Sequence, residues 1–146
     1  NNGNNSCSYH FSSHIIFYEP SAFSLDVSVE EILAPNNYKP FGRMNPICAD
    51  PKIIIKNNGV NPVTSLTINY GVKGGITQTI SWNGNLPFLA TQEITLGAVD
   101  WSGVGTQNVF EVTISDPNGS SDENTLNNML QSSFSLPPSY PNDFVI

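Results

Sequence analysis

Short runs in which every second residue is apolar recur along the chain, and this pattern most strongly limits what it can fold into. Successive side chains of a β-strand point to opposite faces, so such a run buries one face and exposes the other. The pattern is clearest in residues 63–72, with Leu66, Ile68, Tyr70 and Val72 on one face, and in residues 109–115, with Phe110, Val112 and Ile114 on one face. Such segments need a second sheet to cover them, which predicts two sheets packed face to face.

Turn-forming residues separate further runs of the same kind. Strand character covers residues 52–56, 76–82, 92–96 and 128–136, and Ile76, Ile80 and Trp82 share one face of the second run. Turns are expected at Asn57-Asn58-Gly59, Lys73-Gly74-Gly75, Asn83-Gly84 and Asp116-Pro117-Asn118-Gly119, because Asn and Gly tolerate left-handed backbone. The sequence therefore predicts an all-β fold, an antiparallel immunoglobulin-like β-sandwich of about seven strands over residues 48–136.

Composition changes mark boundaries on both sides of this predicted sandwich. Residues 1–34 contain two strand-like runs, one of them with Phe23, Leu25, Val27 and Val29 on one face. We interpret them as an N-terminal strand extension, which either packs on this sandwich or ends a preceding domain. Residues 35–47 are rich in Asn and Pro and read as a linker, and residues 137–146 read as a second linker and the start of a following domain. We therefore expect the chain to be part of a larger protein.

The charge balance excludes several function classes. Charged residues make up only 12% of the chain, and 5 Lys plus Arg against 12 Asp plus Glu give a net charge of −7. A nucleic-acid-binding protein needs a basic surface, and anionic membranes attract basic segments, so neither partner is expected. No apolar run approaches the roughly 20 residues of a membrane-spanning helix. A polar, weakly charged, strand-rich chain is typical of secreted proteins.

The two cysteines, Cys7 and Cys48, are candidates for a disulfide in a secreted chain. Closing a loop of this size would contribute roughly 4 kcal/mol in the chain-entropy description. The alternatives are two separate thiols, or a bond between Cys7 and a cysteine further upstream.

Metal binding has one weak candidate. Asp116, Asp122 and Glu123 lie close in sequence, and their oxygens are the ligands that calcium prefers, although their spacing does not match an EF-hand loop. The alternative is a hairpin in which these side chains cap backbone groups. His10 and His14 lie in a strand-like run, where a separation of four residues spans roughly 13 Å, too far to bind one zinc ion.

Aromatic side chains offer a second kind of candidate site. Trp82, Trp101 and Tyr70 could stack on a sugar, but Trp82 alternates in register with Ile80 and is expected in the core. Trp101 lies in a loop-like segment and is the better surface candidate, unless it covers one end of the core. Nucleophilic catalysis needs a base beside the nucleophile, and both histidines lie outside the predicted sandwich. We expect no catalytic residues and no cofactor.

Several segments resemble a known family. They are Pro51–Gly59, Val63–Tyr70, Thr79–Gly84 and Asp122–Asn128. Together they resemble the CARDB-like domain, a fibronectin-III-like fold common in Bacteroidetes proteins exported by the type IX secretion system. The resemblance covers roughly residues 45–136 and implies a cell-surface adhesion or structural setting, without implying a ligand.

The N-terminal residues carry a second, weaker resemblance. Asn1–Asn5, Ser8–Phe11 and Ile15–Tyr18 look like the closing strand of a peptide-N-glycosidase F-like jelly roll. The catalytic carboxylates of that family lie upstream of this stretch, so none is carried onto a residue of this chain.

These observations favour a non-catalytic module of a secreted or cell-surface bacterial protein. It would space or assemble neighbouring domains or identical copies, with unpaired strand edges available for pairing. The alternative is an accessory domain of a glycoamidase-like enzyme that binds a glycan or a cell-surface protein.

Overall fold

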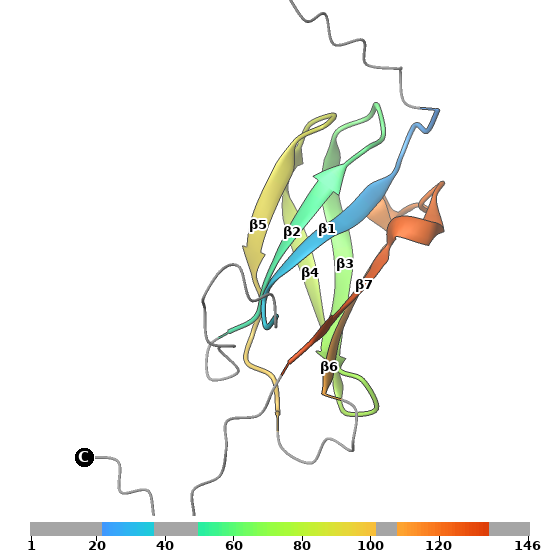
Figure 1. The fold of residues 1–146 in the computed structure, drawn as a ribbon. Helices are drawn as coiled ribbons and strands as arrows, with labels where there is room; N and C mark the ends of the chain where they lie inside the picture. The colour runs from blue at the N-terminus through green and yellow to red at the C-terminus, as the bar shows by residue number, and fades with distance from the viewer. Residues whose placement is uncertain (1–21, 37–49, 102–107, 135–146) are drawn as a thin grey trace, which may run out of the picture.

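The computed structural model describes residues 22–36, 50–101 and 108–134, and in these residues the chain forms a sandwich of two antiparallel sheets (Figure 1). Its strands are β1 (Val27–Ala34), β2 (Lys52–Asn57), β3 (Val63–Val72), β4 (Thr77–Leu86), β5 (Thr91–Thr95), β6 (Val109–Ser115) and β7 (Met129–Ser133). Two short 3-10 helices, η2 (Pro117–Gly119) and η3 (Thr125–Asn127), lie between β6 and β7. The all-β sandwich predicted from period-two alternation is confirmed.

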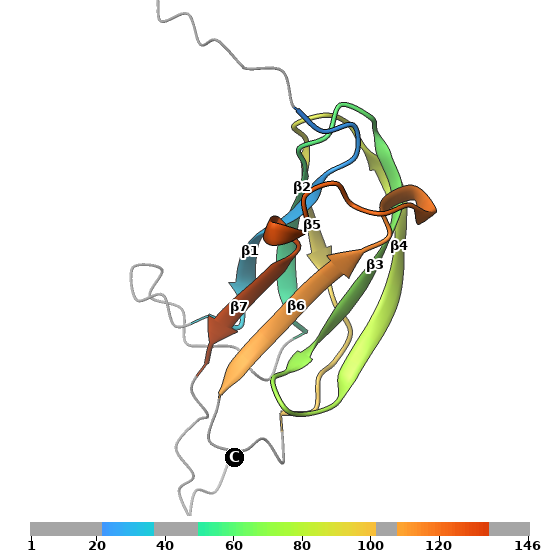
Figure 2. The same cartoon turned by 90° about the vertical axis from the view of Figure 1, so that its right-hand side faces the viewer.

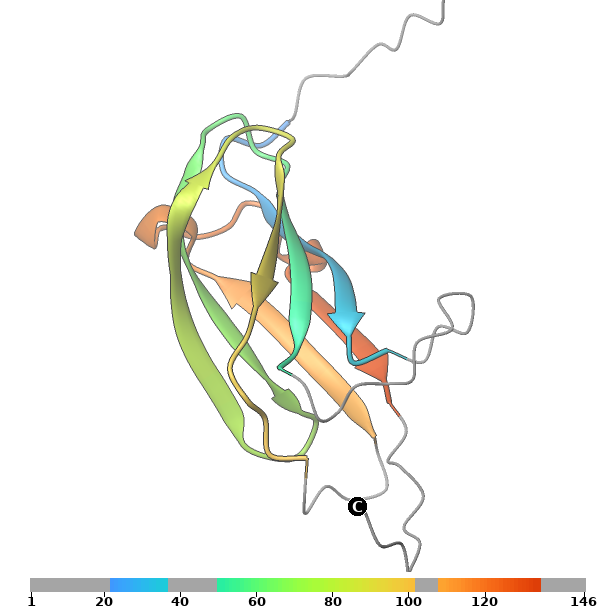
Figure 3. The ribbon, with the colours of Figure 1, turned by 90° about the vertical axis from the view of Figure 1, so that its left-hand side faces the viewer.

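One sheet has three strands in the order β1-β2-β5, and the other has four in the order β4-β3-β6-β7. β4 pairs with β3 in the four-stranded sheet. In the constant-type immunoglobulin order, the fourth strand instead belongs to the same sheet as the first, second and fifth strands. β4 therefore forms one edge of the four-stranded sheet and β7 the other. Figure 2 shows β7 beside β1, and Figure 3 shows β4 at the opposite margin.

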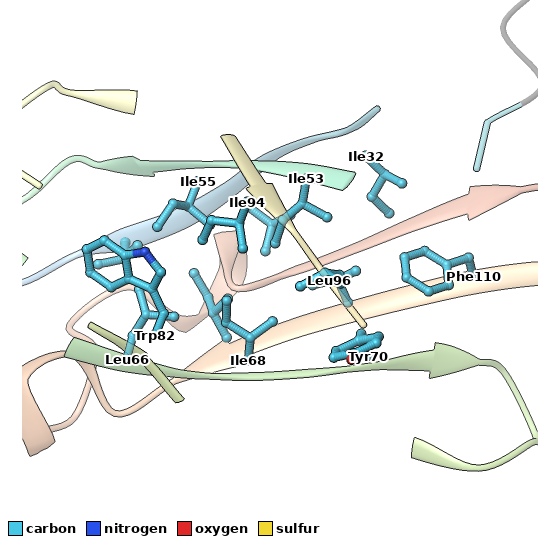
Figure 4. Packing of buried hydrophobic residues seen from close by; sticks show 14 of the residues in the cluster. Ile32, Ile53, Ile55, Leu66, Ile68, Tyr70, Trp82, Ile94, Leu96 and Phe110 are labelled. Carbon is cyan, nitrogen blue, oxygen red and sulfur yellow. The ribbon is translucent and has the colours of Figure 1, made fainter. Parts of the chain in front are cut away.

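The core fills the space between the sheets with the apolar faces that alternate along the strands (Figure 4). Ile53 and Ile55 of β2 meet Ile68 and Tyr70 of β3 in this layer, and each is no more than 2% exposed. The remaining fully buried side chains of the inner faces include Val27, Val63, Leu86, Leu96, Phe110 and Val112. At about 25 cal/mol per Å² of apolar area, this layer is the main source of stability.

The sandwich begins earlier in the chain than position 48. β1 pairs antiparallel with β2 along its length, with Val27 opposite Asn57 and Ala34 opposite Lys52. The predicted N-terminal extension thus contributes a whole strand to the sandwich, which therefore includes residues outside the predicted span 48–136. The polar, Pro-containing stretch 35–47 suggested a domain boundary, but it connects two strands of the same sheet. Residues 37–49 lie outside the described residues.

The β1 strand also differs from strict alternation. The register shifts between Val29 and Glu31, so Glu30 is an extra residue on this strand. A bulge of this kind moves the side chains that follow to the other face. The inward residues are consequently Val27 and Val29 before the bulge and Ile32 after it.

The prediction for β4 was wrong at both ends. Ile76 lies before the strand in the β3–β4 turn and is 73% exposed, so it does not share the buried face of Trp82. The expected Asn83-Gly84 turn is instead part of β4, which continues to Leu86. The chain turns at 87–90, where the Ala90 N–H donates to the Pro87 carbonyl at 3.0 Å and Leu89 has a positive φ of 61°.

The described chain enters and leaves the sandwich at opposite ends. Val27, at the start of β1, lies opposite Asn57 beside the β2–β3 turn, and Ser133, at the end of β7, lies opposite Val109. Val109 precedes Phe110, which pairs with Val72 beside the β3–β4 turn at the other end (Figure 1). Within the described residues, no helix has the length and apolar character needed to cross a membrane.

Candidate functional site

The connection between β6 and β7 carries two acidic side chains that grip the start of β1. Asp122 accepts from the Val27 N–H through Oδ2 at 3.0 Å and from the Asn124 N–H through Oδ1 at 2.8 Å. Glu123 accepts from the Ser24 N–H through Oε2 at 2.9 Å, and its own N–H donates to the Leu25 carbonyl at 3.0 Å. We call Asp122, Glu123 and the backbone of residues 24–27 the acidic clasp.

Two asparagines that lie just before β7 complete the acidic clasp. Asn127 Nδ2 donates to Asp26 Oδ1 at 2.8 Å, which gives a partner to a carboxylate that is only 2% exposed. The Asn128 amide, oriented so that its nitrogen faces acceptors, donates to the Val27 carbonyl at 2.9 Å. Buried polar groups need such partners, so these bonds hold the first strand to the last connection.

The electrostatics of the acidic clasp follow from its burial. Desolvation raises the pKa of Asp122 above its ordinary value of 3.8, and the negative charge of Asp26 raises it further. The hydrogen bonds from the Val27 and Asn124 N–H groups favour the ionised form and oppose this shift.

The three calcium candidates do not come together as one ligand set. Asp116 precedes η2, which packs against β3, and its side chain accepts from Ser115 Oγ at 2.8 Å. In the residues that the structure describes, no three His, Cys, Asp or Glu side chains are placed to hold one metal ion. Asp122 and Glu123 make the backbone-capping bonds that were the alternative interpretation.

Asn118 also binds backbone groups through its side chain, in this case at the start of β3 in the four-stranded sheet. Its Oδ1 accepts from the Thr64 N–H at 2.7 Å, and its Nδ2 donates to the Pro62 carbonyl at 3.0 Å. Residues of the β6–β7 connection therefore tie down both the start of β1 and the start of β3.

The aromatic candidates lie mainly in the core. Trp82 is 8% exposed and Tyr70 only 2%, so neither presents a ring face to solvent. Trp101 is half-buried and packs against the core, with its ring 5.8 Å from that of Phe110 and 5.0 Å, edge-on, from that of Phe134. Trp101 therefore covers part of the core, which was the alternative to a surface position. Trp82, Trp101 and Tyr70 do not form one exposed surface on which a sugar could stack.

One small hollow lies on the outer side of the four-stranded sheet. It measures about 90 Å³ and is lined by Asn69, Gly71, Lys73, Glu111 and Thr113 among others. Ligand pockets commonly enclose about 300–1,000 Å³, so this hollow offers a polar surface depression rather than an enclosing site.

The outer edge of β4 is the longest unpaired strand edge in the described sandwich. The strand has ten residues, Thr77–Leu86, none of them charged, and it pairs on one side only. Sequence reasoning missed its length because Asn83-Gly84 reads as a turn. The absence of Lys, Glu, Asp and Pro across the whole segment was the signal that could have identified it.

Comparison with known proteins supports the fold. No protein-family model matches the chain, and no curated protein matches it either. The solution structure of residues 272–376 of a predicted cell surface protein from Methanosarcina acetivorans is similar, with a TM-score of 0.51 and 19% sequence identity. The match covers 82% of this chain and 98% of that one. At this identity the likeness extends to the fold alone, and the CARDB-like and jelly-roll resemblances stay predictions.

The remaining sequence candidates fall outside the described residues. They are Cys7 and Cys48 of the predicted disulfide, the histidines His10 and His14, and the terminal segment 137–146. The disulfide therefore stays a prediction.

Proposed function

We propose that the chain is a non-catalytic module that spaces or assembles domains of a larger secreted or cell-surface bacterial protein, with strand-edge pairing as its means of assembly. The observation that carries this proposal is the placement of chain entry and exit at opposite ends of the sandwich. A module with this geometry separates its neighbouring domains along its long axis. A module whose chain enters and leaves at the same end would leave its neighbouring domains close together.

The size of the module sets the spacing. β3 has ten residues and runs between the two ends, and strands rise about 3.3 Å per residue, so one module separates its neighbours by roughly 30–35 Å. The acidic clasp supports this role because it fixes residues 24–27, where the chain enters, to the body of the sandwich.

The surface setting is supported by two observations. The similar solution structure comes from a predicted cell surface protein, and the polar, weakly charged composition is typical of secreted β-proteins. The small open hollow and the hydrogen-bonded carboxylates of the acidic clasp favour a structural role over catalysis.

The alternative function is a glycan- or protein-binding accessory domain of a glycoamidase-like enzyme. It depends on Trp101, whose ring already contacts two other rings. A glycan array probed with the chain tests it directly. A signal that disappears in Trp101→Ala, while the fold is retained, would favour the accessory-domain proposal over the spacer.

The spacer proposal is tested by a distance measurement across the module. Spin labels are attached at Ser24→Cys and Ser133→Cys, both exposed in the wild type, after Cys7→Ser and Cys48→Ser. Pulsed electron paramagnetic resonance, on labelled chain diluted into an excess of unlabelled chain so that only separations within one chain are measured, should give a single narrow separation on the order of 35 Å. A short separation would place entry and exit together and overturn the proposal.

A further inference from the structure

The four outer strands of the sandwich differ in how well their free edges are protected. β1 carries Glu30 and Glu31 and is interrupted by two register shifts. β5 is only five residues long and carries Glu93 in an ion pair with Lys52 at 2.8 Å. β7 is equally short and packs beside β1. Short length, charges and bulges are the usual protections against pairing with another chain, and each of these three edges has at least one.

The β4 edge has the least protection of the four. Its ten residues include no charge and no proline, and its regular ladder with β3 extends from Thr77 to Asn83 before a shift near Gly84. The outward side chains Thr77, Thr79, Ser81 and Asn83 are exposed, small and neutral. We propose that β4 pairs antiparallel with β4 of a second copy of this chain, joining two four-stranded sheets into one sheet of eight.

The sequence of β4 suits a two-fold axis at Ser81. This axis places Ser81 opposite its own copy and Thr79 opposite Asn83, so small polar side chains meet on the outer face. On the inner face Ile80 lies opposite Trp82 on both sides of the axis. Aromatic–β-branched and hydroxyl pairs of this kind stabilise neighbouring strands. Because the interface is isologous, every pair except the Ser81 self-pair occurs twice.

The start of β4 has a neighbour that limits the pairing. Gln78 Nε2 donates to the Ala98 carbonyl at 2.6 Å, so the segment after β5 passes beside this end of the strand. The central pairs of the proposed dimer therefore come from residues 79–83, which lie within the regular ladder.

The charge distribution favours pairing between two copies through β4 rather than through β1. Five of the twelve Asp and Glu residues gather in and beside β1, namely Asp26, Glu30, Glu31, Asp122 and Glu123. β1 and β4 are outer strands at opposite margins of the sandwich (Figure 3). Pairing through β4 directs the two acidic sides away from each other, whereas pairing through β1 would bring them together in a protein of charge −7.

This inference rests on the assembly part of the proposed function and is tested by a charge swap at the axis. Sedimentation equilibrium of the full chain, in reducing buffer so that cysteines cannot link copies, should show a mass that approaches twice that of one chain as concentration rises. Ser81→Lys and Ser81→Glu each place like charges opposite each other and should weaken self-association about fivefold or more. An equimolar mixture of the two variants should restore the dimer.

Gln92→Lys is the matched control, because it adds the same charge at an exposed position on the β5 edge. It changes the net charge from −7 to −6, as Ser81→Lys does, and should leave self-association unchanged. A wild type that stays monomeric at every concentration, or a mixture that fails to restore the dimer, would overturn the inference. The spacing measurement between Ser24 and Ser133 is made within one chain, so its failure is separate from failure of the dimer.

Discussion

At the scale of single residues, Asn57 connects three parts of one end of the sandwich. It is fully buried, and its Nδ2 donates to the Asn61 carbonyl at 2.8 Å and to the Leu86 carbonyl at 2.9 Å. Its Oδ1 accepts from the Gly59 N–H at 2.9 Å. One side chain thus makes three hydrogen bonds to backbone groups of the β2–β3 turn and the end of β4.

We expect Asn57→Ala to lower the free energy of unfolding by about 2–4 kcal/mol, because it removes three hydrogen bonds between a fully buried side chain and the backbone. Urea denaturation measures this loss. The neighbouring Asn58→Ala removes a single bond, from Nδ2 to Ser28 Oγ, and should cost about 1 kcal/mol. Equal losses in the two variants would contradict the role assigned to Asn57.

The raised pKa of Asp122 predicts a pH dependence with a definite sign. The folded state keeps this proton to a higher pH than the unfolded state, whose pKa is near 3.8. The associated stability is therefore complete below pH 3.8 and is lost as pH rises through the folded pKa. The group cannot titrate in Asp122→Asn.

Urea denaturation of both proteins at several pH values from about 3 to about 6 checks this dependence. The unfolding free energy of the wild type, measured relative to Asp122→Asn, should fall as pH rises. A relative stability that rises over this range would mean that the hydrogen bonds from Val27 and Asn124 outweigh burial, and that the pKa is lowered instead.

At the scale of elements, β4 depends on a glycine that reads as a turn residue in the sequence. A Cβ at Gly84 would collide with the ring of Trp82, which lies over this position and is nearly buried. Gly84→Ala should therefore displace the ring, destabilise the fold by about 1–3 kcal/mol and shift the tryptophan fluorescence. Asn85→Ala, at an exposed position one residue further on, should leave the spectrum unchanged.

Alternation predicts the regular parts of the fold well and its irregular parts poorly. β3 and β6 were predicted with their observed bounds because every second side chain is buried from Leu66 to Tyr70 of β3 and along all of β6. β1 and β4 were misplaced because a bulge at Glu30 and a register shift near Gly84 depend on the partner strand, which a local pattern does not include.

The candidate sites were harder to predict than the strands, because their partners are distant in sequence. Asp122 and Glu123 stand out as acidic loop residues, but their partners Val27 and Ser24 lie almost a hundred positions away. No spacing rule connects groups so far apart. The edge status of β4 likewise depends on the order of strands in the sheet, which the sequence pattern leaves open.

At the scale of the whole molecule, the net charge of −7 predicts a response to salt. Five carboxylates gather in and beside β1, whereas the ion pairs of Lys52 with Glu93 at 2.8 Å and of Lys56 with Glu30 at 4.0 Å are solvent-accessible and contribute little. Raising sodium chloride from low concentration should therefore raise the melting temperature, with a gain in stability of up to about 1 kcal/mol. Glu31→Gln should reduce this gain, and a melting temperature that falls with salt would show that attractive pairs dominate.

The placement of chain entry and exit at opposite ends also determines how the module would respond to tension. A pull along the long axis would draw β1 one way and β7 the other, parallel to the strands and across their hydrogen bonds. The bonds of each ladder would then carry the load together instead of opening one after another. The acidic clasp lies where the force would enter, so Asp122 and Glu123 would be among the first groups to resist it.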